Sequence, residues 1–238
     1  MNPLSDPINS LEQGQVLADV RRALGRTVTV RPAQLELFVE PTVPEDRFAL
    51  LARFTREFTA VGGRVYRVYS TTEVSGIIAE ICHSASGVKV ALSGAASLAD
   101  LHLAEELKAR DLSPFITTEG GTSGHDELVS QLANCDAGVT AVDYAIAETG
   151  TIVLSSDEPN ALLVSLLPTI HIALLRPSQI SASLGEVISK LNVERVGPGK
   201  SCRSASFITG PSRTSDVELT LSIGVHGPKE LHVIIVGE

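Results

Sequence analysis

The feature that most constrains the fold is an alternation of short strand-like runs with amphipathic helical segments, which starts at Arg64 and continues to the end of the chain. The strand-like runs are rich in β-branched and aliphatic residues, whereas the segments between them carry apolar residues at helical spacing. This alternation is typical of a mostly parallel sheet that is covered by helices on both faces. The sequence therefore predicts an α/β fold.

The individual elements follow from the same pattern. Strands are predicted at Arg64–Tyr69, Val88–Leu92, Pro114–Thr117, Gly138–Val142, Thr151–Leu154, Ile170–Leu174, Ala205–Thr209 and Leu231–Val236. Helices are predicted at Glu45–Val61, Thr72–Ser84, Leu98–Ala109, Asp126–Asn134 and Ile180–Leu191, and one further short helix between the last two strands. No internal repeat and no low-complexity segment interrupts this order.

The residues before Glu45 have a different character. Ser10 to Leu24 are predicted to form a helix that is capped by Ser10 and carries one apolar stripe. Arg26 to Pro44 contains three prolines and no clear period, which is typical of an arm or linker. We therefore divide the chain into an N-terminal helix with an extended arm, residues 1–44, and an α/β domain, residues 45–238. The arm docks either on its own domain or on a partner.

Composition excludes several classes of function. The formal net charge of -9 would repel nucleic acid and anionic membranes, so general affinity for either is not expected. No apolar stretch reaches the length of a membrane span, and no secretory leader is recognisable, so we expect a cytoplasmic protein. The three cysteines lie far apart without a CxxC pair, so we expect no metal and no iron–sulfur cluster in this chain.

Ligands of open α/β sheets bind at the carboxyl ends of the strands, and this rule selects the loops for closer analysis. One of them, Asp143–Gly150, holds two carboxylates before a Thr-Gly-Thr turn. A partly desolvated carboxylate at such a place can act as a general base or a nucleophile, which makes Glu148 and Asp143 candidates. The alternative is structural: Asp143 caps a turn and Glu148 pairs with a neighbouring arginine.

A second loop, Gly210–Glu218, begins with a Gly-Pro turn. Ser215 and Glu218 fit the capping box of a helix that would start at Asp216 and direct free N–H groups toward an anion. Arg213 adds a fork that can hold a carboxylate or phosphate by two hydrogen bonds. The alternative is a capped surface helix with a solvated arginine.

Local charge favours an anionic ligand at this loop. Four basic residues and no acid lie between Arg195 and Ser215, namely Arg195, Lys200, Arg203 and Arg213. Lys200 belongs to a Gly-Pro-Gly-Lys-Ser run, but the glycine that a P-loop requires is replaced by Glu194, so a nucleoside triphosphatase is not expected.

Two histidines have contrasting surroundings. His171 stands inside an apolar strand-like run, which is typical of a hydrogen-bonded core residue. His226 lies between two glycines of a turn, where an imidazole is accessible, and it is the stronger candidate for proton transfer.

Three segments, Thr140–Leu154, Leu166–Leu174 and Gly210–Val236, together resemble the lactate-utilisation protein C family, also called LUD-domain proteins. The matching residues are Ala145-Ile146-Ala147-Glu148-Thr149-Gly150-Thr151, Leu167-Pro168 with His171, Gly210-Pro211-Ser212-Arg213-Thr214 with Asp216 and Glu218, and Gly224-Val225-His226-Gly227-Pro228. The family is similar in fold to ribose-phosphate isomerases, glucosamine-phosphate isomerases and CoA transferases. The resemblance therefore implies the same architecture as the alternation does.

The resemblance also implies a function: oxidation of L-lactate to pyruvate together with two partner proteins, at least one of which carries iron–sulfur clusters. Because the cysteines of this chain are not clustered, the redox centre is expected in a partner. The chain would then be a non-redox subunit that binds a small anion such as lactate or pyruvate, and a homo-oligomer is left open. The residues expected to bind the ligand are Gly210, Ser212, Arg213, Thr214, Lys200, Thr149 and Gly150.

Three readings remain open at this point. In the first, a non-redox subunit holds the anion by Arg213 while His226 exchanges a proton with a hydroxyl. In the second, the chain is an isomerase or an acyl- or CoA-transferase-like enzyme, in which Glu148 is base or nucleophile and Asp143 orients it. In the third, it is a structural assembly subunit whose loops contact a partner.

Overall fold

A computed structural model describes residues 15, 18–20, 22–23, 46–95, 98, 101–117, 124–156, 160–194, 204–215 and 221–237. The chain divides into two units, residues 1–37 and residues 38–238. In the first unit the described residues are helical, as predicted, and Arg22 Nη1 lies 2.9 Å from Asp19 Oδ1. The remainder of the predicted N-terminal helix and the arm lie outside the described residues, so the boundary at residue 44 stays a prediction.

The second unit is built on a six-stranded sheet in which every pair of neighbours is parallel. The strand order is β1 (Arg64–Val68), β12 (Glu230–Val236), β7 (Ile170–Leu175), β4 (Ala137–Ala141), β2 (Lys89–Leu92) and β3 (Ser113–Ile116). The central strands β4 and β7 are buried along their whole length. Their near-continuous apolar sequences are typical of strands covered on both faces.

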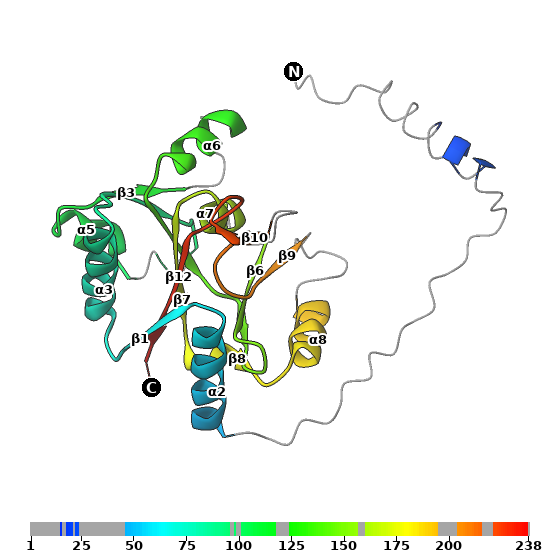
Figure 1. The fold of residues 1–238 in the computed structure, drawn as a ribbon, viewed down its shortest axis with the longest axis horizontal. Coiled ribbons are helices and arrows are strands. Elements are labelled where there is room, and N and C mark those ends of the chain that lie inside the picture. Colours follow the sequence, from blue (N-terminus) through cyan, green and yellow to red (C-terminus); the bar gives the residue numbers. More distant parts are fainter. Residues whose placement is uncertain are drawn as a thin grey trace. The chain divides into compact units, whose positions relative to one another are not determined.

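Helices cover both faces of this sheet (Figure 1). On one face lie α3 (Thr71–Ser84) and α5 (Leu103–Lys108), which bury Ile78, Leu103 and Leu107 against the strands. On the other face α2 (Arg47–Ala60) buries Phe54 and Phe58. Near β2, α6 (His125–Ala133) and α7 (Ala161–Leu166) enclose a smaller apolar cluster. The prediction of a mostly parallel α/β fold with helices on both faces is confirmed.

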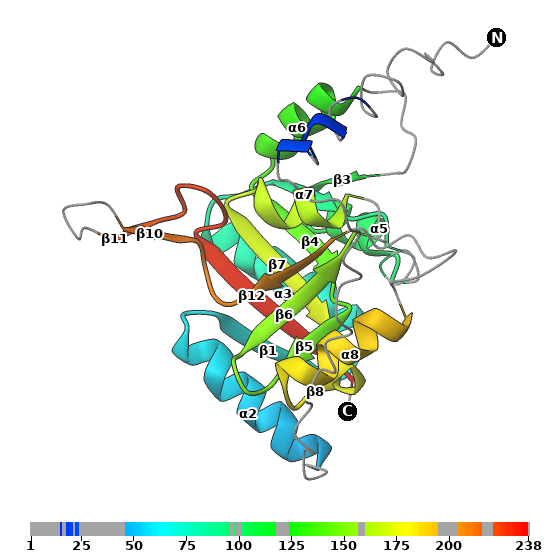
Figure 2. The ribbon, with the colours of Figure 1, turned by 90° about the vertical axis from the view of Figure 1, so that its right-hand side faces the viewer.

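A second sheet shares the face of α2, and its separate existence was not predicted (Figure 2). Its order is β8 (Ile180–Ser181), β5 (Tyr144–Ile146), β6 (Thr151–Ser155) and β9 (Ala205–Ile208), with β6 antiparallel to both neighbours. On its outer side α8 (Leu184–Glu194) packs Val187 and Leu191 against it. The helix predicted from Ile180 therefore begins later, because Ile180 and Ser181 pair with β5 instead.

Two short paired strands flank the segment that was predicted to form a helix after Ser215. β10 (Arg213–Ser215) pairs antiparallel with β11 (Leu221–Ile223), and Ser215 stands opposite Leu221. Ser215 is therefore a strand residue and not a helix cap, while residues 216–220, including Glu218, lie outside the described residues. Alternating apolar and hydroxyl side chains in β11 favour extended pairing over a helical turn. None of the helices that the structure describes is long and apolar enough to cross a membrane.

Candidate functional site

Several of the predicted site residues line a hollow of about 480 Å³. Its walls are residues 206–212, residues 226–228, Leu162, Ser165 and Leu166 of α7, and Leu231 of β12. We call it the amino-edge hollow. Gly210, Ser212 and His226 line it, so the structure brings three of the predicted residues together.

The hollow lies at the opposite edge of the main sheet from the one that the sequence predicted. β12 begins at Glu230 and β7 at Ile170, at the same edge of the sheet (Figure 2). The hollow is formed by the segments that precede these strands. The error has a topological cause. Residues 210–215 follow β9, which belongs to the second sheet, so the rule for carboxyl ends of the parallel strands does not place this loop.

At the carboxyl edge itself there is a much smaller cavity, of about 80 Å³. Ala141, Leu174 and Val236 line it together with Arg176 and Gln179. The Gln179 side chain is already engaged: its Nε2 donates to the Val142 carbonyl and its Oε1 accepts from the Arg176 N–H at 2.7 Å. The cavity that the described residues form at this edge is therefore small, and its Gln179 side chain is already bonded.

The two Gly-Pro turns of the sequence meet beside the hollow. The Ser212 N–H donates to the Pro228 carbonyl at 3.0 Å, and the Gly224 N–H donates to the Ser212 carbonyl at 2.9 Å. A Cβ atom on Gly227 would lie 3.1 Å from the Ser212 Cβ, so glycine permits this close approach. The structure therefore brings the two turns next to each other.

Arg213 does not line the hollow. Its Nη2 donates to the Val61 carbonyl at 2.6 Å, at the C-terminal end of α2. A cation stabilises this end of a helix, where backbone carbonyls lack helical partners. Thr214 stands in β10 opposite Ser222. In the structure, then, Arg213 attaches the hairpin to α2, and its predicted role as an anion clamp has no support from a shared cavity.

A chain of threonine hydroxyls connects a second motif to the hollow. Thr149 Oγ1 lies 2.7 Å from Thr151 Oγ1, which lies 2.8 Å from Thr209 Oγ1 in the wall of the hollow. Gly150 adopts a φ of +61°, and a Cβ atom there would lie 2.2 Å from the Phe58 nitrogen. Thr149 and Gly150 therefore form a turn that packs on α2 and reaches the hollow only through Thr209.

The two candidate carboxylates are bound to backbone N–H groups. Glu148 Oε1 accepts from the Leu184 N–H at 2.6 Å, at the start of α8. Asp143 is buried, and its Oδ2 accepts from the Ser155 N–H at 2.6 Å. Neither residue lines the amino-edge hollow. Glu148, Arg213 and His226 thus do not converge on one cavity, which corrects the expectation that they share a site.

The histidines separate as the sequence suggested. His226 is exposed at the hollow, whereas His171 is fully buried and its Nε2 lies 2.9 Å from Thr140 Oγ1. Burial, with a contribution from His232, lowers the pKa of His171 to about 3. His232, which the sequence analysis did not single out, is also buried, and burial lowers its pKa despite a hydrogen bond to Glu230. Both imidazoles are therefore neutral core groups.

Several predicted features lie outside the described residues, among them Lys200 and the basic residues Arg195 and Arg203.

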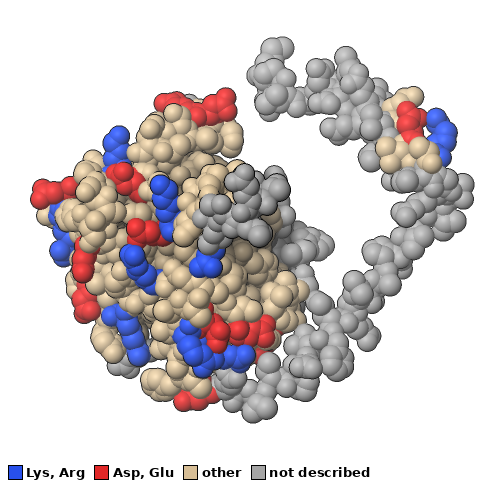
Figure 3. Space-filling view, viewed as in Figure 1, with Lys and Arg blue, Asp and Glu red and all other residues tan. Residues whose placement is uncertain are grey.

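Cys82 and Cys135 are buried free thiols, and burial raises the pKa of Cys82 to about 11. Cys202 is not described. No group of three histidine, cysteine or acidic side chains that could hold a metal occurs in the described part of the chain. On the face shown in Figure 3, the described acidic and basic side chains are interspersed.

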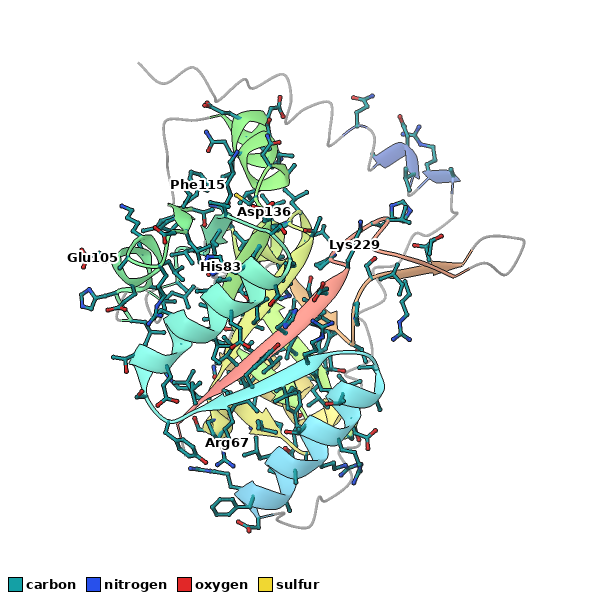
Figure 4. The ribbon with its side chains drawn as sticks, turned by 60° about the vertical axis from the view of Figure 1, so that its left-hand side comes forward. Arg67, His83, Glu105, Phe115, Asp136 and Lys229 are labelled. Carbon is teal, nitrogen blue, oxygen red and sulfur yellow. The ribbon has the colours of Figure 1, made fainter. Side chains whose placement is uncertain are left out.

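Sequence reasoning missed the hydroxyl and apolar residues that make most of the hollow. Ser206 comes from β9, Thr209 directly follows that strand, and Leu166 comes from α7, a helix that was not predicted. Asp136 was also missed: its Oδ2 accepts from the N–H groups of Val88 and Lys89, both at 2.8 Å, and so joins β4 to β2. Asp136 and Lys229 mark the starts of β4 and β12 in Figure 4.

These features define the class: an α/β protein with a parallel sheet, a second sheet on one face, and a hollow where two Gly-Pro turns meet. The chain belongs to the LUD domain family, which it matches over residues 51–236. It is 36% identical over 111 residues to "Lactate utilization protein C" from Halalkalibacterium halodurans, covering 47% of this chain and 48% of the relative. It thus spans about half the length of that relative.

Two longer matches extend over most of the chain. "Uncharacterized protein YkgG" from Escherichia coli is 29% identical over 230 residues, which covers 94% of this chain and 97% of that protein. A solved structure, that of a DUF162 family protein from Deinococcus radiodurans, matches with a TM-score of 0.57 and 25% identity. The match covers 82% of this chain and all of that chain, so the fold is shared by a solved structure.

Proposed function

We propose that this protein acts in lactate utilisation as a subunit that binds a small organic anion, such as lactate or pyruvate, in the amino-edge hollow. The observation that carries the proposal is the meeting of Ser212 and His226, from the two motifs of the LUD resemblance, beside one hollow. The name "Lactate utilization protein C" of the relatives supports the pathway. Redox chemistry is assigned to iron–sulfur partner proteins, because no cysteine of this chain has a neighbouring cysteine in the sequence.

The polar groups of the hollow suit a hydroxy or keto acid. Ser212 and Thr209 offer hydroxyls, His226 offers an imidazole that can exchange a proton, and the walls from α7 and the prolines are apolar. Because Arg213 is bonded to Val61, we assign it to positioning the Ser212 turn and not to direct contact with the anion. Lys200 remains a proposed source of positive charge.

Thermal shift with L-lactate, pyruvate and inorganic phosphate tests the binding step. A ligand at a hundred times its Kd stabilises the folded state by about 2.7 kcal/mol, and Tm rises accordingly. We expect His226→Ala and Ser212→Ala to remove this rise while leaving the ligand-free Tm nearly unchanged. His83→Ala is the matched control, because His83 is an exposed histidine on α3. Unchanged Tm with all three anions, or a full rise in His226→Ala, would contradict the proposed site.

A further inference from the structure

Strand β9 has one edge that no described residue pairs with. Its other edge is joined to β6, with Ile208 opposite Ile152 and Ser206 opposite Leu154. In the strand order of the second sheet, β9 is the terminal strand. The same strand forms one wall of the amino-edge hollow, to which four consecutive residues, 206–209, contribute. Because successive side chains point to opposite faces, a hollow lined by consecutive residues runs along the edge of the strand.

The hydrogen-bond pattern shows which backbone groups this edge presents. The Ser156 N–H donates to the Ser204 carbonyl at 2.9 Å, so Ser204 is turned toward β6. Val153, opposite Phe207, is turned the other way, since its carbonyl accepts from the Asp143 N–H at 3.0 Å. In an antiparallel pair these directions alternate along the strand. The N–H and C=O groups of Ala205 and Phe207 therefore point away from β6.

This edge lacks the features by which sheet edges are usually protected. The strand reads Ala-Ser-Phe-Ile, with no charged residue and no proline, although its four residues keep it short. Phe207 is 41% exposed, and Leu166, across the hollow on α7, is 50% exposed. An uncharged edge that is flanked by exposed apolar side chains favours pairing with another extended strand.

We propose that β9 pairs antiparallel with β9 of a second copy of this chain, about a twofold axis at Phe207. The outward N–H and C=O groups are self-complementary. A twofold axis at Phe207 places Phe207 opposite Phe207 of the second copy, and it places Ala205 opposite Thr209 of the second copy. Twofold dimers are the commonest symmetric assemblies. Each copy has a formal net charge of -9, so two copies repel each other over most surfaces, and an uncharged strand removes that repulsion at the contact.

The dimer would complete the hollow. Ile208 packs on the side of β9 that faces α2 and the main sheet, whereas Ala205 packs on the side of α8. A twofold axis perpendicular to the paired strands keeps the same face inward in both copies. The second copy's Ser206 and Ile208 then project over the mouth of the hollow. This inference goes beyond the proposed function, since it requires no particular ligand.

Molar mass in solution tests the inference first. We expect size-exclusion chromatography with light scattering to give twice the chain mass of 25.1 kDa for the full chain. Phe207→Pro should give a monomer, because the lost N–H points outward and the ladder with β6 does not use it. The control Phe48→Gln removes another exposed aromatic, on α2, and should remain a dimer. Circular dichroism should show that both variants are folded.

Cysteine cross-linking tests the axis itself. In the Cys202→Ser background, Phe207→Cys should form a covalent dimer on mild oxidation, since Cα atoms of a hydrogen-bonded pair lie about 5.5 Å apart. Phe48→Cys in the same background should not. A monomeric wild type overturns the proposal. So does a dimer that survives Phe207→Pro without cross-linking at residue 207.

Other occupants of the edge would also overturn the proposal, and they give distinct results. A dimer that appears only after deletion of residues 1–44 would assign the edge to the N-terminal segment of the chain. A wild-type monomer that binds an iron–sulfur partner, with binding lost in Phe207→Pro, would assign it to that partner. Because anion-induced thermal shift is measured separately, failure of the dimer is distinguishable from failure of the lactate-binding proposal.

Discussion

The two edges of the main sheet use their polar side chains in different ways. At the carboxyl edge, Asp143 and Gln179 are bonded to backbone groups, and the cavity that the described residues form there measures about 80 Å³. At the amino edge, no described residue bonds the side chains of Ser212 or His226, and the hollow measures about 480 Å³. Polar side chains that already satisfy backbone groups maintain the fold, whereas unengaged ones around a hollow are available to a ligand.

The largest effect that this comparison predicts comes from the turn that packs against α2. In Gly150→Ala the new Cβ would lie 2.2 Å from the Phe58 nitrogen and 2.5 Å from the Glu57 carbonyl carbon, at a φ of +61°. We expect a loss of about 3 kcal/mol or more in the free energy of unfolding, measured with urea.

Gly76→Ala is the matched control for this variant. A Cβ atom at Gly76, inside α3, has no neighbour closer than 3.9 Å, so helix propensity should leave the protein equally stable or more stable by up to about 1 kcal/mol. A loss below about 1 kcal/mol in Gly150→Ala would show that the turn and α2 separate easily. The packing that supports Thr149, Thr151 and Thr209 beside the amino-edge hollow would then be loose.

The sequence predicted the parallel sheet well because strands such as β4 and β7 are buried on both faces and therefore consist of uninterrupted apolar residues. It also singled out the turns that carry Ser212 and His226, because glycine and proline mark these turns. What it did not predict is how the strands divide between two sheets. β6 and β9 have ordinary strand patterns, and only the long-range pairing of Ile152 with Ile208 shows that they form another sheet.

The misplaced edge follows from that division. Glu148 and Arg213 have the same residue types as catalytic and anion-binding groups, yet each is bonded to a distant part of the backbone, at Leu184 and at Val61. A sequence pattern states which groups are present but not whether a backbone N–H or carbonyl already engages them. Such partners are set by packing and not by local spacing.

The next effect concerns His171, which is buried on β7 close to the amino edge. Its folded pKa is about 3, against about 6.5 in the unfolded chain, so the unfolded state binds more protons between these values. Stability therefore falls as pH drops below about 6.5, by about 1.4 kcal/mol per pH unit from this group alone. The prediction is checked by urea unfolding at several pH values.

His171→Asn should reduce that pH slope, because asparagine can still bond Thr140 but does not titrate. His232 remains in the variant and keeps its own contribution, since its pKa is also lowered by burial. Equal slopes for the wild type and His171→Asn would mean that the imidazole is hydrated. The amino edge would then be open to water below the hollow, which would sharpen the contrast with the carboxyl edge.

The smallest expected effect is that of Glu148→Gln, and it tests whether chemistry takes place at Glu148 or at the amino-edge hollow. The amide oxygen of glutamine can still accept from the Leu184 N–H, so only the favourable charge at the start of α8 is lost, about 0.5 kcal/mol. The Glu148 carboxylate is bonded at the start of α8 and does not line the hollow. Purified protein incubated with acetyl-CoA should therefore form no hydroxylamine-sensitive adduct, and Glu148→Gln should keep the anion-induced rise in Tm. A covalent adduct that mass spectrometry locates at Glu148 would instead show that the carboxylate leaves α8 during a reaction, and the turn between β5 and β6 would then be the catalytic site.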